Sequence, residues 1–163
     1  MTKQLSVQRF SVVSSKPFEE VLQGLEKGMG RPDMRVLHGQ MTATSSFREY
    51  EKVIHAAVGS ADLMEFLRLD LGAPMGKDPN AKSFKIVRII AGNPLIMKQM
   101  VESVPDAGSY APVKILVYES KDGVRLSYDT MVSYLASYDK SAVLEVARSL
   151  DEKVTRLLTE AAG

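Results

Sequence analysis

The sequence has no cysteine and no marked excess of charge of either sign. Without cysteine, disulfide bonds and thiolate chemistry are excluded. The 21 basic and 20 acidic side chains give a formal net charge of +1, so no nucleic acid and no anionic membrane is indicated as a partner. No apolar run approaches the roughly 20 residues that cross a bilayer. Together these absences fit a cytoplasmic protein.

Common catalytic and metal-binding motifs are also missing. The chain has no Gly-rich phosphate loop, no nucleophile elbow and no His-Glu zinc motif. His38 and His55 do not have a metal-ligand spacing, so neither a metal nor another cofactor is expected. No catalytic residue can be assigned. The nearest alternative is an enzyme that uses Asp70 or Glu119 together with a tyrosine for acid–base work on a small organic substrate.

The chain length of 163 residues and its 45% apolar content suit a single domain spanning residues 1–163. Residues 5–13 predict a strand, and Ser14 to Pro17 predict the start of a helix. In that helix the apolar side chains fall at helical spacing, which predicts a core-facing stripe made of Phe18, Val21, Leu22 and Leu25.

The next segment is harder to interpret. Residues 34–37 predict a short strand, and a second amphipathic helix is expected near residues 46–58. Residues 63–71 suit either a helix or a strand. We favour a strand, because Leu67 and Leu69 alternate with Arg68 and Asp70, which indicates one apolar and one wet face.

The C-terminal half is clearer. Residues 84–91 predict a central strand covered on both faces, and a helix is expected over 94–103. Residues 113–119 and 124–129 predict a hairpin with a three-residue loop at 121–123, a register that places Glu119 opposite Arg125 and Tyr118 opposite Leu126. A helical turn is expected over 131–136. A helix of about 20 residues follows, capped by Asp139 or Ser141 and long enough to lie across the sheet.

This half also carries a family resemblance. Its marks are Ile90 to Pro94, Met97 and Met100, then Ala107, Tyr110 to Lys114, Tyr118-Glu119, Asp122-Gly123, Tyr128-Asp129 and Leu150-Asp151. With these residues the chain resembles the family known as domain of unknown function 302, mainly over residues 82–163.

The resemblance implies a fold and an assembly. It implies an α+β domain with a mostly antiparallel sheet, β-α-β4-α-like and TATA-binding-protein-like, and a long C-terminal helix packed across it. Residues 31–62 are then an insertion that contains the extra helix near 46–58. The resemblance also implies a homodimer. Related proteins tend to have Asp-His-Gly where this chain has Asp70-Leu71-Gly72, so a mechanism that needs a base there is in doubt.

The candidate binding residues gather around Asn93. Asn93 and Pro94 suit the first positions of a helix, and the alternative is that the helix start binds an anion with its free amides. Tyr118 and Tyr128 are expected on one face of the hairpin, either packed in the core or pointing into a pocket with Asn93. Met97 suits core packing, a dimer interface or a pocket wall.

Three functions therefore remain open. The first is a non-catalytic, homodimeric protein that binds or senses a small molecule at Asn93, Pro94, Met97, Tyr118 and Tyr128. The second is the carboxylate–tyrosine enzyme. The third is a structural or protein-interaction module that uses an exposed apolar face.

Overall fold

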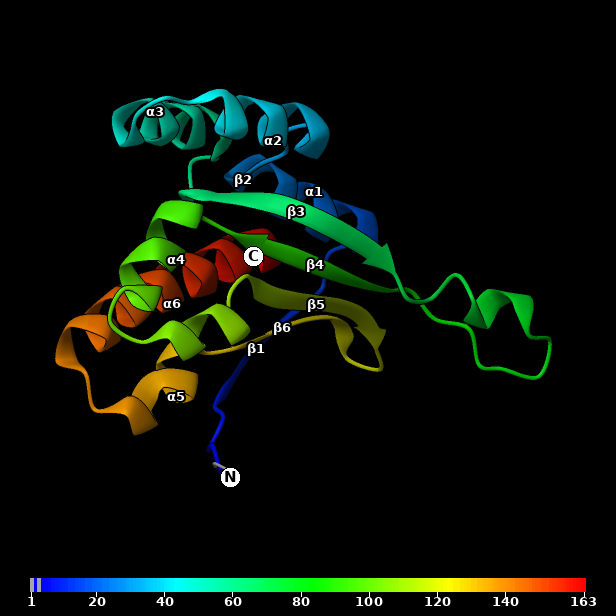
Figure 1. The fold of residues 1–163 in the computed structure, drawn as a ribbon. Coiled ribbons are helices and arrows are strands. Elements are labelled where there is room, and N and C mark those ends of the chain that lie inside the picture. Colours follow the sequence, from blue (N-terminus) through cyan, green and yellow to red (C-terminus); the bar gives the residue numbers. More distant parts are fainter. Residues whose placement is uncertain (1, 3) are drawn as a thin grey trace.

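A computed structural model describes residue 2 and residues 4–163 and shows an α+β fold built on one six-stranded sheet (Figure 1). In chain order the elements are β1 (Arg9–Ser14), α1 (Phe18–Gly28), β2 (Met29–Gly30), α2 (Met34–Ala43), α3 (Phe47–Ala57), β3 (Leu63–Asp70), β4 (Ile86–Gly92), α4 (Pro94–Val101), β5 (Val113–Ser120), β6 (Gly123–Asp129), α5 (Met131–Leu135) and α6 (Ser141–Ala162). Short 3₁₀ turns lie at Met75–Lys77, Pro105–Ser109 and Ala136–Tyr138. The predicted fold class is confirmed.

The strands lie in the order β1-β6-β5-β4-β3-β2. Every neighbouring pair is antiparallel except β2 and β3, which are parallel over two residues. The order β1, α1, β3 to β6, α6 reproduces the predicted β-α-β4-α pattern. The two-residue strand β2 extends the sheet at the β3 edge.

Helices α1 and α6 pack side by side on one face of the sheet, called here the inner face. The predicted stripe of α1 is confirmed, because Phe18, Val21 and Leu25 are buried in the main core. Gly24 lets α1 approach α6 closely, since a Cβ there would lie 2.9 Å from the Cα of Ala161. Each fully buried Leu or Val contributes about 1.5–3 kcal/mol, so this face supplies most of the stability.

Helices α2 and α3 form an α-hairpin that lies over the β2–β3 edge (Figure 1). The predicted strand at 34–37 is wrong, because these residues begin α2. The side chain of Asp33 accepts hydrogen bonds from the amides of Arg35 and Val36 and so caps this helix. The hairpin packs through a second, small hydrophobic cluster centred on Leu37, Ile54 and Met64. The extra helix predicted at 46–58 is α3.

Strand β3 is correctly predicted, but its two faces are reversed. A bulge between Glu65 and Leu67 adds one residue, so Leu67 and Leu69 turn away from the core and Arg68 turns toward α1. Leu67 is 50% exposed and Leu69 37% exposed. They lie on the face opposite α1 and α6, called here the outer face.

The outer face carries a group of apolar side chains that are exposed or half-buried. By strand register the group comprises Val13, Leu67, Leu69, Ile86, Ile90, Leu116 and Tyr118. Strand β4 is therefore central, as predicted, but only its inner side is fully covered, with Val87, Ile89 and Ala91 buried. We refer to these seven residues as the outer apolar patch.

Residues 71–85 form an arm that joins β3 to β4 and projects beyond the sheet (Figure 1). This agrees with the predicted loop. The carboxylate of Asp70 accepts hydrogen bonds from the amides of Gly72 and Ala73, and so holds the turn at the base of the arm.

The first strand and the last helix begin slightly differently from prediction. The first strand begins at Arg9 rather than Leu5, because its partner β6 ends at Asp129, directly opposite Arg9. Helix α6 begins at Ser141 after Lys140, and neither Asp139 nor Ser141 caps it with a side chain. Among the described helices, none combines the length and the apolar character that crossing a bilayer requires.

Candidate functional site

A cavity of about 430 Å³ lies where β4 turns into α4. Its walls come from segments far apart in the sequence. The β4–α4 junction supplies Gly92, Asn93 and Pro94, and the α4 helix supplies Ile96, Met97 and Met100. The opposite walls are formed by Met41 and Tyr50 of the α-hairpin, by Phe66 of β3, by Leu150 of α6, and by Gly108 and residues 111–113. Of the predicted binding residues, Asn93, Pro94 and Met97 therefore line one cavity.

Asn93 begins α4 as predicted. Its Oδ1 atom accepts a hydrogen bond from the amide of Leu95 at 2.9 Å, and Pro94 occupies the first helical turn, where no amide donor is needed. The other end of the side chain is also engaged. Its Nδ2 atom donates to the backbone oxygen of Asp62 at 3.2 Å and to the carboxylate of Asp62 at 2.9 Å.

These bonds tie three elements together beside the cavity. Asp62 lies before β3 with a left-handed backbone (φ 58°), and its carboxylate also receives the ammonium of Lys153 from α6. Asn93 is 5% exposed, so leaving its side-chain amide without hydrogen-bond partners would cost stability. The side chain of Asn93 is thus fully used in holding α4 against β3 and α6.

Gly92, without a side chain, leaves room for Phe66 and Pro112 to pack closely against the end of β4. A Cβ at this position would lie 3.2 Å from a ring carbon of Phe66 and 3.5 Å from the Cβ of Pro112. The peptide between Ala111 and Pro112 is cis. Thus Gly92, Pro112 and Phe66 meet at close range on one side of the cavity.

The two candidate tyrosines do not join this site. The expectation that they share a face of the hairpin is wrong, because β5 and β6 pair one residue out of the predicted register. Ser120 pairs with Gly123, which leaves a two-residue loop, and Tyr118 lies opposite Arg125. A shift of one residue moves side chains to the other face. Tyr118 is on the outer face and Tyr128 is on the inner face.

Tyr128 instead belongs to a buried polar cluster with Asp151. Its hydroxyl donates to Oδ1 of Asp151 at 2.6 Å. The same carboxylate accepts the amides of Met131 at 2.7 Å and Val132 at 3.1 Å, so Asp151 caps α5 from α6. Burial raises the pKa of Asp151, and these hydrogen bonds oppose the rise. Burial also raises the pKa of Tyr128, and the neighbouring Asp151 adds to this effect.

The sequence pattern does not single out Asp151 as a candidate site residue. It belongs to the Leu150-Asp151 pair of the family resemblance, and it lies between Ala147 and Val154 on the buried side of α6. An acidic residue within the apolar stripe of a helix needs polar partners, so its position in the stripe indicates a buried polar contact.

The two carboxylates considered for catalysis, Asp70 and Glu119, serve local structure, and so does Asp129 at the end of β6. Asp70 holds the turn after β3. Glu119 does not face Arg125 as predicted. It accepts the backbone amide of Lys85 at 2.9 Å and so ties the arm to β5. Asp129 forms a two-pronged ion pair with Arg9, whose hydrogen bond holds the pKa of Asp129 below its usual range.

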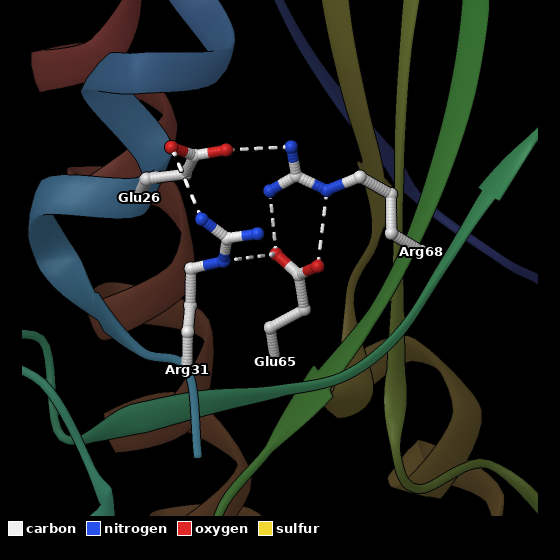
Figure 2. Close-up of polar contacts among 4 residues, drawn as sticks. All are labelled: Glu26, Arg31, Glu65 and Arg68. Atoms are coloured by element: carbon white, nitrogen blue, oxygen red, sulfur yellow. Dashed lines mark hydrogen bonds and ion pairs between the residues drawn. The ribbon is translucent and has the colours of Figure 1, made fainter. Parts of the chain in front are cut away.

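A second ionic cluster links α1 to β3 (Figure 2). Arg68 binds Glu65 through two nitrogens, at 3.0 and 2.6 Å, and reaches Glu26 of α1 at 2.6 Å. Arg31 contacts Glu26 at 3.3 Å and Glu65 at 3.9 Å. Burial lowers the pKa of Arg68, but the two glutamates outweigh it and the pKa is raised overall. Each charge has an opposite partner, so the cluster is a structural tie.

Neither histidine lies in a cluster of ligands. His38 and His55 are exposed on α2 and α3. Within residues 2 and 4–163, no group of three or more His, Asp or Glu side chains could hold a metal ion.

Comparison with known proteins places the fold but assigns no activity. The sequence model of DUF302, a domain of unknown function, matches residues 39–161. The structure is similar to the crystal structure of an uncharacterised conserved DUF302 protein from Bacillus stearothermophilus, with a TM-score of 0.65 and 12% identity, over 94% of this chain and 97% of that one. No curated protein matches.

Proposed function

The chain belongs to the DUF302 family, and we propose that it is a non-catalytic, homodimeric protein that binds or senses a small molecule in the cavity at the start of α4. The observation that carries the proposal is the cavity itself. Its volume of about 430 Å³ lies within the range of small-molecule sites, which are mostly apolar and largely preformed.

The composition of the walls favours binding over catalysis. General acid–base catalysis needs a titratable group within reach of the substrate. Among the residues that line the cavity, only Tyr50 carries a titratable side chain. Asp70 and Glu119 are engaged with backbone amides elsewhere, which counts against the carboxylate–tyrosine enzyme.

A sensing role is supported by the way the walls are divided. Met41 and Tyr50 belong to the α-hairpin, whereas Met100 and Val113 belong to the main core. A ligand between them would contact both hydrophobic clusters. We propose that occupancy is communicated as a change in how firmly the α-hairpin packs on β3.

The experiment is native mass spectrometry of the protein purified from its own host. We expect an additional mass that survives gentle ionisation. Met97→Trp should remove it, because Met97 lines the cavity and a larger side chain there would take up part of its volume. Gln99→Trp is the matched control, since Gln99 is exposed on the same helix and does not line the cavity. An apo protein, or a mass that Met97→Trp retains, would contradict the proposal.

We also propose that the outer apolar patch is the homodimer contact. Exposed apolar side chains on one sheet face need cover, and a two-fold dimer pairs such a patch with itself. The arm supports this choice, because a hollow of about 580 Å³ on the outer face is bordered by Lys82 and Phe84 of the arm together with Ile86 and Tyr118. A partner subunit seated there would contact both the sheet and the arm. Arg88 and Lys114 also lie on the outer face, between residues of the patch. In the proposed dimer they would face polar groups of the partner subunit.

The proposed setting is the cytoplasm, where a chain without cysteine needs no oxidising compartment to fold. Fractionation of the host with an antibody against the protein would test this location.

A further inference from the structure

We infer that the cavity selects a neutral, largely apolar molecule and holds one of its polar atoms by a hydrogen bond to the hydroxyl of Tyr50. This inference rests on the proposed function and adds the chemical class of the ligand.

Charge is the first criterion, and the cavity walls carry none. No Asp, Glu, Lys, Arg or His is among the residues that line it. A buried ion without a partner is strongly disfavoured, so a carboxylate, phosphate or ammonium on the ligand would find no compensation. The charged side chains Asp62, Lys98 and Lys153 line a separate groove on the other side of Asn93.

The start of α4 does not compensate for this lack. An anion at a helix start uses free backbone amides. Here Pro94 has no amide hydrogen, and the amide of Leu95 already donates to Asn93. The first two positions of the helix therefore offer no free amide, which disfavours the alternative in which this helix start binds an anion.

Tyr50 is the polar contact that remains. The cavity has two polar side chains, Asn93 and Tyr50, and the amide of Asn93 is fully engaged with Leu95 and Asp62. The hydroxyl of Tyr50 has no hydrogen bond to any of the described residues, while its ring stacks on Phe47 with centroids 6.2 Å apart. The hydroxyl of this half-buried tyrosine, without a partner among the described residues, is available to a ligand.

The walls also indicate how strict the selection is. Three methionines, Met41, Met97 and Met100, contribute flexible side chains from two helices. Unbranched thioethers adapt to irregular shapes and favour contact with aromatic rings. We expect shape tolerance among neutral ligands together with strong rejection of charged ones.

The test uses two fluorescent probes with one skeleton. N-phenyl-1-naphthylamine is neutral, and 8-anilinonaphthalene-1-sulfonate is the same molecule with a sulfonate. Titration of the purified protein should show the neutral probe binding at least tenfold more tightly. Tyr50→Phe, which keeps the ring, should lower the affinity for the neutral probe about fivefold, because one hydrogen bond is lost. Met97→Trp and, independently, Ala111→Leu should abolish its binding, whereas Gln99→Trp should not.

The outcomes separate the two claims. If the sulfonate binds as tightly as the neutral probe and is lost in Met97→Trp and Ala111→Leu, the neutral class is wrong while the cavity remains a binding site. If Tyr50→Phe binds the neutral probe as tightly as the unmodified protein does, the proposed hydrogen bond to Tyr50 is wrong. If neither probe responds to the two blocking variants, the cavity is not a ligand site, and the proposed function fails with the inference.

Discussion

Replacing Tyr128 with phenylalanine tests the buried cluster that joins the sheet to α6. Tyr128 is 2% exposed, and its hydroxyl donates to Asp151 at 2.6 Å. The substitution removes this hydroxyl and leaves the ring in place. Asp151 keeps its bonds to the amides of Met131 and Val132, so α5 remains capped. The change therefore removes the bond to the buried carboxylate together with a longer one, in which the hydroxyl accepts the amide of Met131 at 3.2 Å. The amide of Met131 keeps its bond to Asp151.

Its magnitude follows from the type of bond. A hydrogen bond to a charged group contributes about 1.5–3 kcal/mol. For a chain of this length such a loss lowers Tm by about 3–12 °C. Urea unfolding followed by circular dichroism would measure the free energy of unfolding. Tyr50→Phe is the matched control, because the hydroxyl of Tyr50 has no hydrogen bond to the described residues. In the ligand-free protein it should change stability by less than about 0.5 kcal/mol.

The pH dependence supplies a second check. Burial raises the pKa of Asp151 above its unfolded value, so ionisation of Asp151 opposes folding and stability is lost as pH rises through that pKa. The Tyr128 hydroxyl favours the ionised form, and its removal should raise the pKa further. The cost of Tyr128→Phe should thus be largest at neutral pH and shrink as pH falls through the pKa of Asp151. A cost below about 0.5 kcal/mol at neutral pH, or one that grows in acid, would refute this account.

Three other substitutions test the remaining contacts. Leu67→Glu should shift the dimer to monomer in light scattering at micromolar concentration, while Val36→Glu, at a 57%-exposed site on α2, should not; a monomeric unmodified protein would contradict the dimer. Glu65→Gln should lower the unfolding free energy by about 2 kcal/mol, because it leaves Arg68 half-buried with a weakened partner, and an unchanged urea midpoint would contradict that role. Asn93→Ala should cost about 1–2 kcal/mol through the lost cap of α4, and calorimetry showing no change in Tm would contradict it.

Sequence patterns predicted the elements whose cause is local. The stripe of α1 and the Asn93-Pro94 start of α4 follow from spacing and capping, and both are confirmed. The wrong strand prediction at residues 34–37 has a local explanation too, because Asp33 is a helix cap and marks the start of α2.

The sequence pattern did not predict the strand register or the β-bulge. The hairpin loop is two residues long, and a slip of one residue was enough to separate Tyr118 from Tyr128. The bulge after Glu65 likewise reversed the faces of β3 and produced the exposed Leu67 and Leu69. In both places the alternation was recognised, but its phase relative to the core depends on pairing between strands.

The candidate site was predicted in part for the same reason. Asn93, Pro94 and Met97 are close in sequence and were identified together. The opposite wall, with Tyr50 and Phe66, comes from segments that only the tertiary fold brings near. The helical spacing of α3 predicts only that Tyr50 faces the hydrophobic cluster. It does not predict that Tyr50 also lines a cavity.

The most direct test of the ligand cavity is a methyl NMR spectrum of the protein labelled at its nine methionines. Addition of N-phenyl-1-naphthylamine should shift the methyl signals of Met41, Met97 and Met100, which line the cavity, and leave Met29 and Met75 unchanged. Substitution of each methionine by leucine would assign the signals. Shifts confined to methionines outside the cavity, or no shift at saturating probe, would contradict the account.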